Sequence, residues 1–426
     1  MKRRSLLLGS AGVALAAGGA ALLWRPEDLG APHDLYFAEL NSLLRRAGPG
    51  RPVMLLDMER LNSNIDKIRA SVGPDKTYRI VVKSLPSLPL LAHVMQRANT
   101  KALMVFHQPF LNAIAEAFAD ADVLLGKPMP VKAAETFYSK LASRQLESNK
   151  FDPARQLQWL IDTPERLGQY QALAQQLGVK MRVNVEIDMG LHRGGLASPA
   201  TLATMLDVIK ADPEHLEFAG LMGYEPHLTG MQAELDHPAV VAVLAIYRGF
   251  ISQVTLAGYD PSQLTLNGAG SHTLSIYERD TTMNDLSAGS GIVKPMDFDT
   301  YHLRDYQPAL FIATPILKRY DQLTLPGDTP LATLLPLWNP NMQRLYFIYG
   351  GYWKARVVSP AGVPAPIYQS TNQSPITTSA KVDLAVDDYM FLRPTQSEHV
   401  MLQFGDLLPF ANGRLLAPWP VFQQTG

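Results

Sequence analysis

Short β-rich runs alternate with helical patterns along residues 50–295, and this alternation constrains the fold more than any other feature of the chain. The strand candidates are Val53–Asp57, Arg79–Lys83, Ala102–Phe106, Asp122–Leu125, Gln158–Asp162, Arg182–Asp188, Glu217–Tyr224 and Gln263–Asn267. Helical patterns separate them, as in Pro109–Ala119 and Pro164–Leu177. A strand followed by a helix, repeated about eight times, predicts parallel β/α units that close into a TIM-type (β/α)8 barrel.

The sequence changes character after Pro295. Long helical patterns end, and short β-rich runs appear at Ala309–Ile316, Leu345–Ile348, Val382–Val386 and His399–Gln403. We therefore expect a mainly β C-terminal domain over residues 296–426, with a long surface loop at 358–380. The barrel domain is expected over residues 29–295, and its lead-in at 29–50 is expected to pack on the C-terminal domain.

Residues 1–28 are expected to be an export signal or a membrane anchor. A basic start, Lys2-Arg3-Arg4, precedes a run of Leu, Ala, Gly and Val that reaches Trp24. This pattern is typical of an export signal, and its arginine pair resembles a twin-arginine signal. The run is also just long enough to span a bilayer, so an uncleaved anchor is an alternative. The protein is thus expected to be periplasmic or exported, and to meet a membrane only through this segment if it is uncleaved.

Composition narrows the function classes. The chain has 426 residues, of which 47% are hydrophobic and 18% are charged, and this balance predicts a globular protein of two domains. The net charge of −1, with no long basic block beyond the N-terminus, gives no electrostatic basis for binding nucleic acid. The absence of cysteine excludes disulfides, thiolate catalysis and zinc held by cysteine.

Lys83 ends the apolar run that starts at Tyr78. Burying an ammonium group is costly, so a lysine at the end of a core strand needs an explanation. A desolvated lysine is a candidate Schiff-base nucleophile, because burial lowers the pKa of its amine. The alternative is a lysine whose aliphatic stem covers apolar surface while its charge reaches water. The other motifs of the chain favour the nucleophile.

Two Gly-rich turns follow other strand candidates, where barrels build their active sites. The turn from Asp188 to Gly195 contains Arg193, whose guanidinium can donate to a phenolate or a carboxylate. The loop Gly268-Ala269-Gly270-Ser271 follows the last barrel strand candidate. Its backbone N–H groups and hydroxyl are donors that suit a phosphate.

Two histidines and a tyrosine are further candidates. Tyr224 ends a strand candidate, and His227 follows it, where it could act as a base, a ligand or a stacking partner. His399 stands in Ser397-Glu398-His399, which could equally begin an exposed strand.

Together these segments resemble the fold-type III pyridoxal-phosphate enzymes, the alanine-racemase-like barrels. Among them the chain most resembles the D-threonine aldolase and D-serine dehydratase-like family. The resemblance starts at Arg51-Pro52 and extends to the C-terminus. It includes Arg79-x-x-x-Lys83, the turn Asp188-x-Gly-x-x-Arg193-x-Gly, the strand end Gly220–His227 and the loop Gly268–Ser271, in the order that the family has them.

The resemblance implies the cofactor and its ligands. It implies pyridoxal 5′-phosphate joined to Lys83 as an internal aldimine, with Arg193 near the phenolate oxygen. It places Tyr224 and the 268–273 loop around the phosphate. It also implies a homodimer with active sites near the subunit interface.

Three departures from the family pattern stand out. The cofactor lysine usually follows Pro-His-x, where this chain has Ile80-Val81-Val82. Pro226 stands where glycine is usual. The family carries a pair of metal ligands after a Gly-Asp turn, but Pro420 and Phe422 occupy about those positions here, and neither side chain can bind a divalent ion. We therefore predict that the usual metal ion is absent.

The resemblance implies a lyase that acts on a small D-β-hydroxy amino acid, as a D-threonine aldolase or a D-serine dehydratase does. Lys83 is then the candidate base at Cα, and His227 or His399 the candidate base for the β-hydroxyl proton. One alternative is an amino-acid racemase of the same fold, which needs a second base on the opposite face. Another is an exported protein that binds pyridoxal phosphate without turnover.

Overall fold

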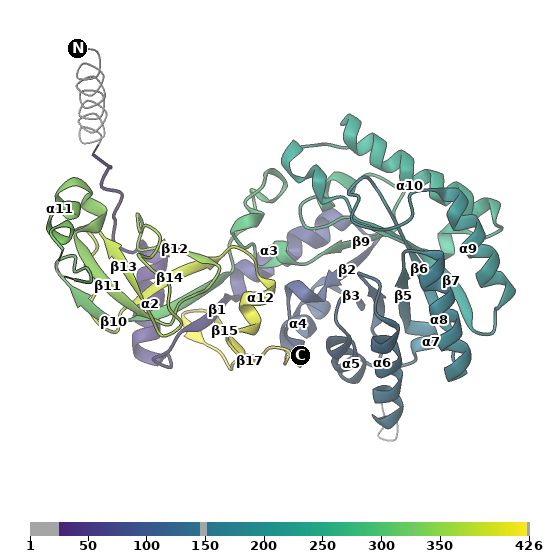
Figure 1. Cartoon of the computed structure of the whole chain (residues 1–426), viewed down its shortest axis with the longest axis horizontal. Helices are drawn as coiled ribbons and strands as arrows, with labels where there is room; N and C mark the ends of the chain where they lie inside the picture. Colours follow the sequence, from purple (N-terminus) through teal and green to yellow (C-terminus); the bar gives the residue numbers. More distant parts are fainter. Residues whose placement is uncertain (1–24, 145–150, 328, 424–426) are drawn as a thin grey trace, which may run out of the picture. The chain divides into compact units, whose positions relative to one another are not determined.

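The computed structural model describes residues 25–144, 151–327 and 329–423, so most of the expected export signal lies outside the described residues. These residues form two compact units (Figure 1). Unit 2 contains Leu56–Leu310, Gln396–Pro409 and the described residues from Ala417 onward; unit 1 contains the described residues up to Leu55, Phe311–Thr395 and Phe410–Leu416. The chain thus passes between the units several times, whereas the sequence predicted a single boundary at residue 295.

Unit 2 is built on a closed barrel of parallel strands with helices around it (Figure 1), which confirms the predicted fold class. The strands follow one another in chain order: β2 (Thr77–Val81), β3 (Ala102–Val105), β4 (Asp122–Leu125), β5 (Leu157–Ile161), β6 (Met181–Ile187), β7 (Leu216–Gly223), β8 (Thr265–Gly268) and β9 (Asp285–Ala288). β9 pairs with β2 and closes the ring.

The prediction of the first barrel strand was wrong. Val53–Asp57 forms a fully buried strand, β1, but it pairs between β10 and β15 in a second sheet. The barrel instead gains β9 as its last strand, at Asp285–Ala288. An apolar run shows that a strand is buried, but it does not show which sheet the strand joins.

The barrel helices begin and end at residues that satisfy their free backbone groups. The helices are α3 (Met58–Val72), α4 (Leu88–Ala98), α5 (Gln108–Ala117), α6 (Val131–Arg144), α7 (Pro153–Gln156), α8 (Pro164–Leu177), α9 (Pro199–Ala211) and α10 (Pro238–Leu256). In α8, the Thr163 side chain accepts the Arg166 N–H at the start, and Gly178, with φ of 62°, ends the helix in the left-handed conformation.

Within the described residues, α10 is the one helix long and apolar enough to cross a membrane by length and composition. It packs on the barrel through one face, which includes Val243 and Phe250. The buried Tyr247 hydroxyl lies 3.1 Å from the carbonyl oxygen of Leu221 and 3.0 Å from that of Asn267. These contacts are those of an outer helix of the barrel.

The C-terminal part of the chain is mainly β, as predicted, and most of its strands belong to a second sheet. Its strands run in the order β12 (Ala355–Ser359), β14 (Tyr389–Pro394), β10 (Leu310–Tyr320), β1 (Val53–Asp57), β15 (Asp406–Ala411) and β16 (Arg414–Leu415), with β11 (Arg344–Tyr349) beside β10, β13 (Gln373–Thr378) beside β11 and β17 (Trp419–Pro420) beside β15. The short helix α11 (Leu331–Trp338) belongs to unit 1, whereas the short helix α12 (Glu398–Leu402) belongs to unit 2.

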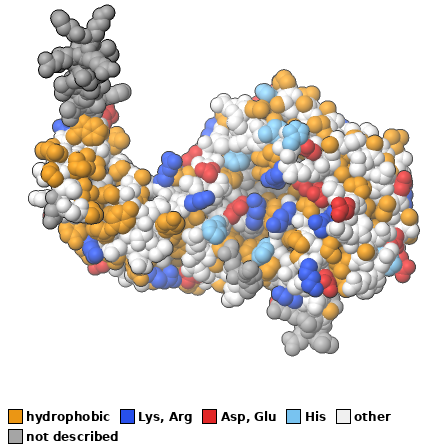
Figure 2. Space-filling view, in the orientation of Figure 1, with side chains coloured by type: hydrophobic (Ala, Val, Ile, Leu, Met, Phe, Trp, Pro, Cys, Tyr) orange, Lys and Arg blue, Asp and Glu red, His pale blue; other side chains and the backbone are white. Residues whose placement is uncertain are grey.

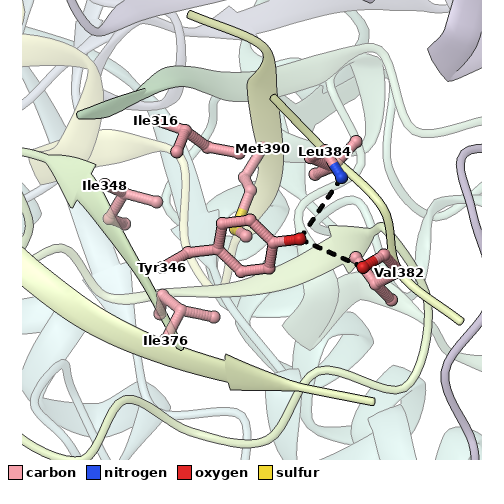
Figure 3. Packing of buried hydrophobic residues seen from close by; sticks show 7 residues of the cluster. All are labelled: Ile316, Tyr346, Ile348, Ile376, Val382, Leu384 and Met390. Atoms are coloured by element: carbon pink, nitrogen blue, oxygen red, sulfur yellow. Dashed lines mark hydrogen bonds between the residues drawn. The ribbon is translucent and has the colours of Figure 1, made fainter. Parts of the chain in front are cut away.

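A tyrosine organises a core cluster in unit 1 (Figure 3). Tyr346 packs among aliphatic side chains and is completely buried. Its hydroxyl donates to the Val382 carbonyl at 3.0 Å and accepts the Leu384 N–H at 3.3 Å. The predicted strand Val382–Val386 is therefore wrong: the segment is irregular and contributes side chains and backbone groups to this core.

Two further predictions for this region were wrong, and one is confirmed. His399–Gln403 belongs to helix α12, and the expected loop at 358–380 contains strand β13. Residues 29–50 do pack on the C-terminal strands, through helix α2 (Leu35–Ala47). Asn41 Nδ2 and Arg45 Nη1 both donate to Asp388 Oδ1 at 2.9 Å.

A buried arginine ties the barrel together from inside. The Arg79 side chain, on β2, has no exposed surface. Its Nη2 lies 2.7 Å from Asp285 Oδ2 on β9 and 2.7 Å from Asp122 Oδ2 on β4. It also donates to the carbonyl oxygen of Leu103 on β3. Asn267 on β8 donates to Asp285 Oδ1 at 2.6 Å, so the carboxylate is bonded on both sides.

We expect Arg79→Met to lower the free energy of unfolding by about 3–5 kcal/mol, because it leaves the buried Asp285 carboxylate without its counter-charge. Arg97→Ala breaks an exposed ion pair with Asp66 and is expected to cost less than about 1 kcal/mol. Urea unfolding of both variants measures the difference. Adding Asp285→Asn to Arg79→Met should recover part of the loss, and equal losses for Arg79→Met and Arg97→Ala would contradict this account.

Candidate active site

A cavity of about 340 Å³ lies at the carboxyl ends of the barrel strands. Side chains from successive strand ends line it, among them Lys83 after β2, Phe106 after β3, Asp162 after β5 and Tyr224 after β7. The volume suits a small ligand. Catalytic residues of parallel barrels gather at this face, so the cavity is the candidate active site.

Lys83 lies in the short 3-10 helix η1 (Val82–Ser84), directly after β2. Its Nζ is 2.9 Å from Glu398 Oε1 and 5.0 Å from the centre of the Phe106 ring. The side chain is 43% exposed, so the desolvated amine expected from the sequence is not what the structure contains. The amine instead faces the cavity and is oriented by a carboxylate.

A chain of hydroxyl groups leads to Glu398. Ser397 Oγ lies 3.3 Å from Ser290 Oγ, and Ser290 Oγ donates to Ser84 Oγ at 2.9 Å. Ser84 Oγ in turn donates to Glu398 Oε1 at 3.4 Å. Because the three serines are buried, this chain fixes the carboxylate that pairs with Lys83.

The turn after β6 brings Arg193 to the cavity. Asp188 Oδ1 shapes this turn by accepting the N–H groups of Gly190 at 2.9 Å and His192 at 3.0 Å. The Arg193 guanidinium lies 5.2 Å from the centre of the Tyr224 ring. Burial is the largest of the effects that raise the pKa of Tyr224, to about 12, so this hydroxyl keeps its proton at neutral pH.

The loop after β8 fits closely around Tyr224. A Cβ atom on Gly270 would lie 2.7 Å from the Tyr224 ring, so only glycine allows the ring to come so near. Thr273 Oγ1 accepts the Gly270 N–H at 3.0 Å and donates to the buried Glu225 Oε1 at 2.6 Å. The buried carboxyl group of Glu225 therefore holds the loop in place through the Thr273 hydroxyl.

Ser271 joins this loop to the turn after β9. Its Oγ accepts the N–H groups of Gly289 at 3.1 Å and Gly291 at 3.0 Å. Its own hydrogen is then left to donate to a ligand in the cavity, which Ser271 lines. Hydroxyl and backbone donors on small residues suit an anion such as a phosphate.

Most of the predicted cofactor residues meet at the cavity. Its lining contains Lys83, Arg193, Tyr224, Ala269, Gly270 and Ser271. Gly268 is the last residue of β8 and is not part of the lining; a Cβ atom there would collide with the Met283 sulfur.

The two predicted histidines do not line the cavity. His227 lies in the 3-10 helix η3 (Pro226–Met231), close to Gly190, and its buried Nδ1 has no hydrogen-bond partner among the described residues. His399 is exposed in α12, one residue after Glu398. Because a strand was predicted at 399–403, the sequence-based prediction missed helix α12, whose first residue, Glu398, pairs with Lys83.

Sequence reasoning also missed several titratable groups that line the cavity, among them Glu186 and His272. Burial, followed by repulsion from Asp162, raises the pKa of Glu186 to about 7. His272 stacks on Phe298 with ring centres 4.2 Å apart, and burial lowers its pKa to about 4, so its ring is neutral at pH 7. Glu186 stands in an alternating strand two residues before Asp188, which is the one sequence signal that could have located it.

Pro420 and Phe422, which stand about where the resemblance led us to expect a metal pair, make apolar or backbone contacts. Phe422 is buried and stacks on Phe110 with ring centres 4.3 Å apart, and Pro420 pairs with Asp406 in β17. Among the described residues, no group of three or more His, Asp or Glu side chains lies close enough to hold a metal ion. The absence of a metal ion in the working protein stays a prediction.

Sequence comparison identifies relatives of the barrel. The family model for the alanine racemase N-terminal domain matches residues 56–294, which is more than half of the chain. The 3-hydroxy-D-aspartate aldolase of Paracoccus denitrificans is 24% identical over 168 residues, which cover 37% of this chain and 42% of the aldolase. The aligned region is thus less than half of that protein.

Solved structures share the fold over nearly their whole length. D-threonine aldolase from Filomicrobium marinum matches with a TM-score of 0.66 at 15% identity, over 87% of this chain and 96% of that one. Alanine racemase from Bacillus anthracis gives a TM-score of 0.66 at 14% identity, over 87% and 97%. D-threo-3-hydroxyaspartate dehydratase from Delftia sp. HT23 gives 0.64 at 13%, over the same shares. The resemblance inferred from the motifs is confirmed.

We expect Glu186→Gln to change how stability depends on pH. The folded-state pKa of about 7 lies above the ordinary 4.5, so the native protein binds more protons than the unfolded chain between these values. Wild-type stability therefore falls as pH rises through this window, and the variant lacks that fall. Urea unfolding across the window measures the difference. Asp162→Asn removes a charge that raises the pKa of Glu186, so stability should fall over a narrower pH range in that variant. If the stability of the wild type and of Glu186→Gln changed with pH in parallel, the raised pKa would be contradicted.

Proposed function

We propose, from the premise that this chain belongs to the alanine racemase N-terminal domain family, that it is a pyridoxal-phosphate-dependent lyase acting on a small D-β-hydroxy amino acid. The observation that carries the proposal is the amine of Lys83, which faces the cavity beside Arg193, Tyr224 and a loop of small residues. A nucleophilic amine and an anion-binding loop in one cavity are the two features that this cofactor requires.

The residues present fit the cofactor. Lys83 would hold its aldehyde carbon, and the Ser271 hydroxyl with the loop from Ala269 would receive its phosphate. Arg193 would donate to an oxygen on the ring. When bound, pyridoxal phosphate would supply a conjugated ring that accepts the electron pair released at Cα of an amino acid.

Lys83 is the proposed proton carrier at Cα, and Glu398 is the residue that positions it. The Lys83 amine can take or return a proton there, and Glu398 Oε1, 2.9 Å away, orients that amine and stabilises its charged form. The hydroxyl chain through Ser84 keeps Glu398 in place. Glu398 was assigned no role from the sequence.

Glu186 is the proposed base for the β-hydroxyl proton. A group whose pKa is about 7 can both accept and return a proton at neutral pH. His227 and His399, the two sequence-based candidates, do not line the cavity, whereas Glu186 does. His272, with its neutral ring, is positioned to hydrogen-bond a polar substrate group rather than to carry charge.

The choice of substrate class rests on the relatives. The aligned Paracoccus protein is named for 3-hydroxy-D-aspartate, and two of the structural neighbours are a D-threonine aldolase and a D-threo-3-hydroxyaspartate dehydratase. All three names specify a D-amino acid with a β-hydroxyl. Alanine racemase matches the fold equally well, so racemisation is the second candidate.

We also propose that the protein is an exported homodimer.

Incubation with D-threonine, D-serine and L-alanine tests the proposal. Release of an aldehyde or an oxoacid from a D-β-hydroxy amino acid supports the lyase, while inverted chirality of alanine would replace it with the racemase. Cofactor binding without any reaction would replace the lyase proposal with a binding protein.

The Lys83→Ala variant should lose the visible absorbance of the bound cofactor, and its turnover should fall at least about 10²-fold. Lys127→Ala, at the same cavity, is the control for a general loss of positive charge.

We expect Glu398→Gln to lower kcat by about 10²–10⁴-fold with little change in KM, because it removes a charged partner of the proton-carrying amine without changing the shape of the site. His399→Gln alters the neighbouring exposed residue and should leave kcat close to the wild-type value. Steady-state kinetics on the substrate found above measures both. A larger loss for His399→Gln than for Glu398→Gln would reverse the assignment.

A further inference from the structure

Helix α11 (Leu331–Trp338) leaves most of its large apolar side chains exposed in the described part of unit 1. It contains no charged residue, and none of its residues is buried. The exposed fractions of its large side chains are 54% for Leu331, 57% for Leu334, 69% for Leu337 and 36% for Trp338. We call these four residues the α11 patch. Single exposed leucines are ordinary, but a cluster on one short helix indicates a binding surface.

The spacing of the α11 sequence is that of a helix designed to bury one side. Leu331, Leu334, Leu335 and Trp338 follow the i, i+3, i+4, i+7 pattern of an apolar stripe. In a core helix such a stripe is buried, whereas here Leu331, Leu334 and Trp338 are exposed and Leu335 is half-buried. Figure 2 shows hydrophobic side chains gathered over the part of unit 1 where Figure 1 labels α11.

The N-terminal segment leaves unit 1 beside this helix. Asn341, in the 3-10 helix η9 (Pro340–Met342) just after α11, accepts the Leu29 N–H at 3.0 Å through Oδ1. Its Nδ2 donates to the Glu27 carbonyl at 2.7 Å. Residues 27–29 are therefore anchored next to the C-terminal end of α11. The residues that precede them in the chain are the apolar run that ends at Trp24.

We propose that the α11 patch inserts into the surface of a lipid bilayer, as a second membrane contact in addition to the one proposed for the N-terminal run. The helix has eight residues and is about 12 Å long, too short to cross a bilayer, so it would lie in the plane of the interface. Because α11 carries no basic residue, apolar burial and not attraction to anionic lipid drives the contact. The sequence alone led us to expect membrane contact only through the N-terminal segment.

Two other occupants of the patch are physically reasonable. Residues 1–24 could fold back onto α11, or a second copy of the chain could cover it. The bilayer is favoured because the apolar run that ends at Trp24 is the membrane contact expected from the sequence, and Glu27 and Leu29, which follow it closely, are bound next to α11. A single weak contact becomes a stable attachment when a second one acts at the same place.

The absence of cysteine allows a direct test in the full chain. Leu334→Cys is labelled with an environment-sensitive fluorophore, and the protein is reconstituted into phosphatidylcholine vesicles, with and without a nitroxide on the lipid acyl chain. We expect a blue shift of the emission on reconstitution and loss of emission with the nitroxide lipid, both unchanged by high salt. Leu256→Cys, on α10 and 81% exposed, is the matched control and should show neither effect.

Three outcomes would overturn the proposal. A probe at 334 that emits as in water and is not quenched shows that the patch does not touch lipid. A blue-shifted probe that the nitroxide lipid does not quench shows that protein covers the patch, and the concentration dependence of the shift then separates a second copy from residues 1–24. Equal quenching at 256 shows that contact is not specific to α11. Leu331→Gln with Leu337→Gln should reduce the quenching at 334 while the visible absorbance of the bound cofactor stays unchanged.

Discussion

The buried ion pair between Arg79 and Asp285 is the constraint on which the barrel depends. It links β2 to β9, the first and last strands of the ring, and Arg79 also reaches Asp122 on β4. A charge in a barrel interior is tolerated only when every polar group around it is bonded, as Asp285 is by Asn267 on β8. These interactions inside the barrel therefore fix the strands whose ends form the candidate site.

At the carboxyl ends of the strands, hydrogen bonds between loops hold the residues of the site in place. Ser271 joins the loops after β8 and β9, and Ser84 connects η1 to Glu398. Each of these hydroxyls bonds groups from different segments, so a change in one loop is transmitted to its neighbour. The proposed chemistry uses the two kinds of charge that these bonds orient: the amine of Lys83 and the carboxyl groups around it.

The sequence predicts the regular parts of the fold and the order of the motifs, but not the contacts made across the chain. Helix α8 could be placed within its observed bounds because Thr163 and Gly178 cap it. β9 could not be predicted, since Asp285 and Ser287 are polar residues that bond Asn267 inside the barrel and so interrupt the apolar pattern. Glu398 was missed because nothing local shows that residues 396–409 return to the barrel unit, more than three hundred residues after Lys83.

This late return has a consequence for biosynthesis. The barrel strands are complete once residue 288 has been made, yet the carboxylate beside Lys83 is translated only after more than a hundred further residues. A nascent chain therefore contains every barrel strand before the counter-charge of the lysine has been synthesised. Under this order, a shortened product that ends with the barrel could fold and still lack the group that orients its amine, so maturation of the site is coupled to release of a full-length polypeptide from the ribosome.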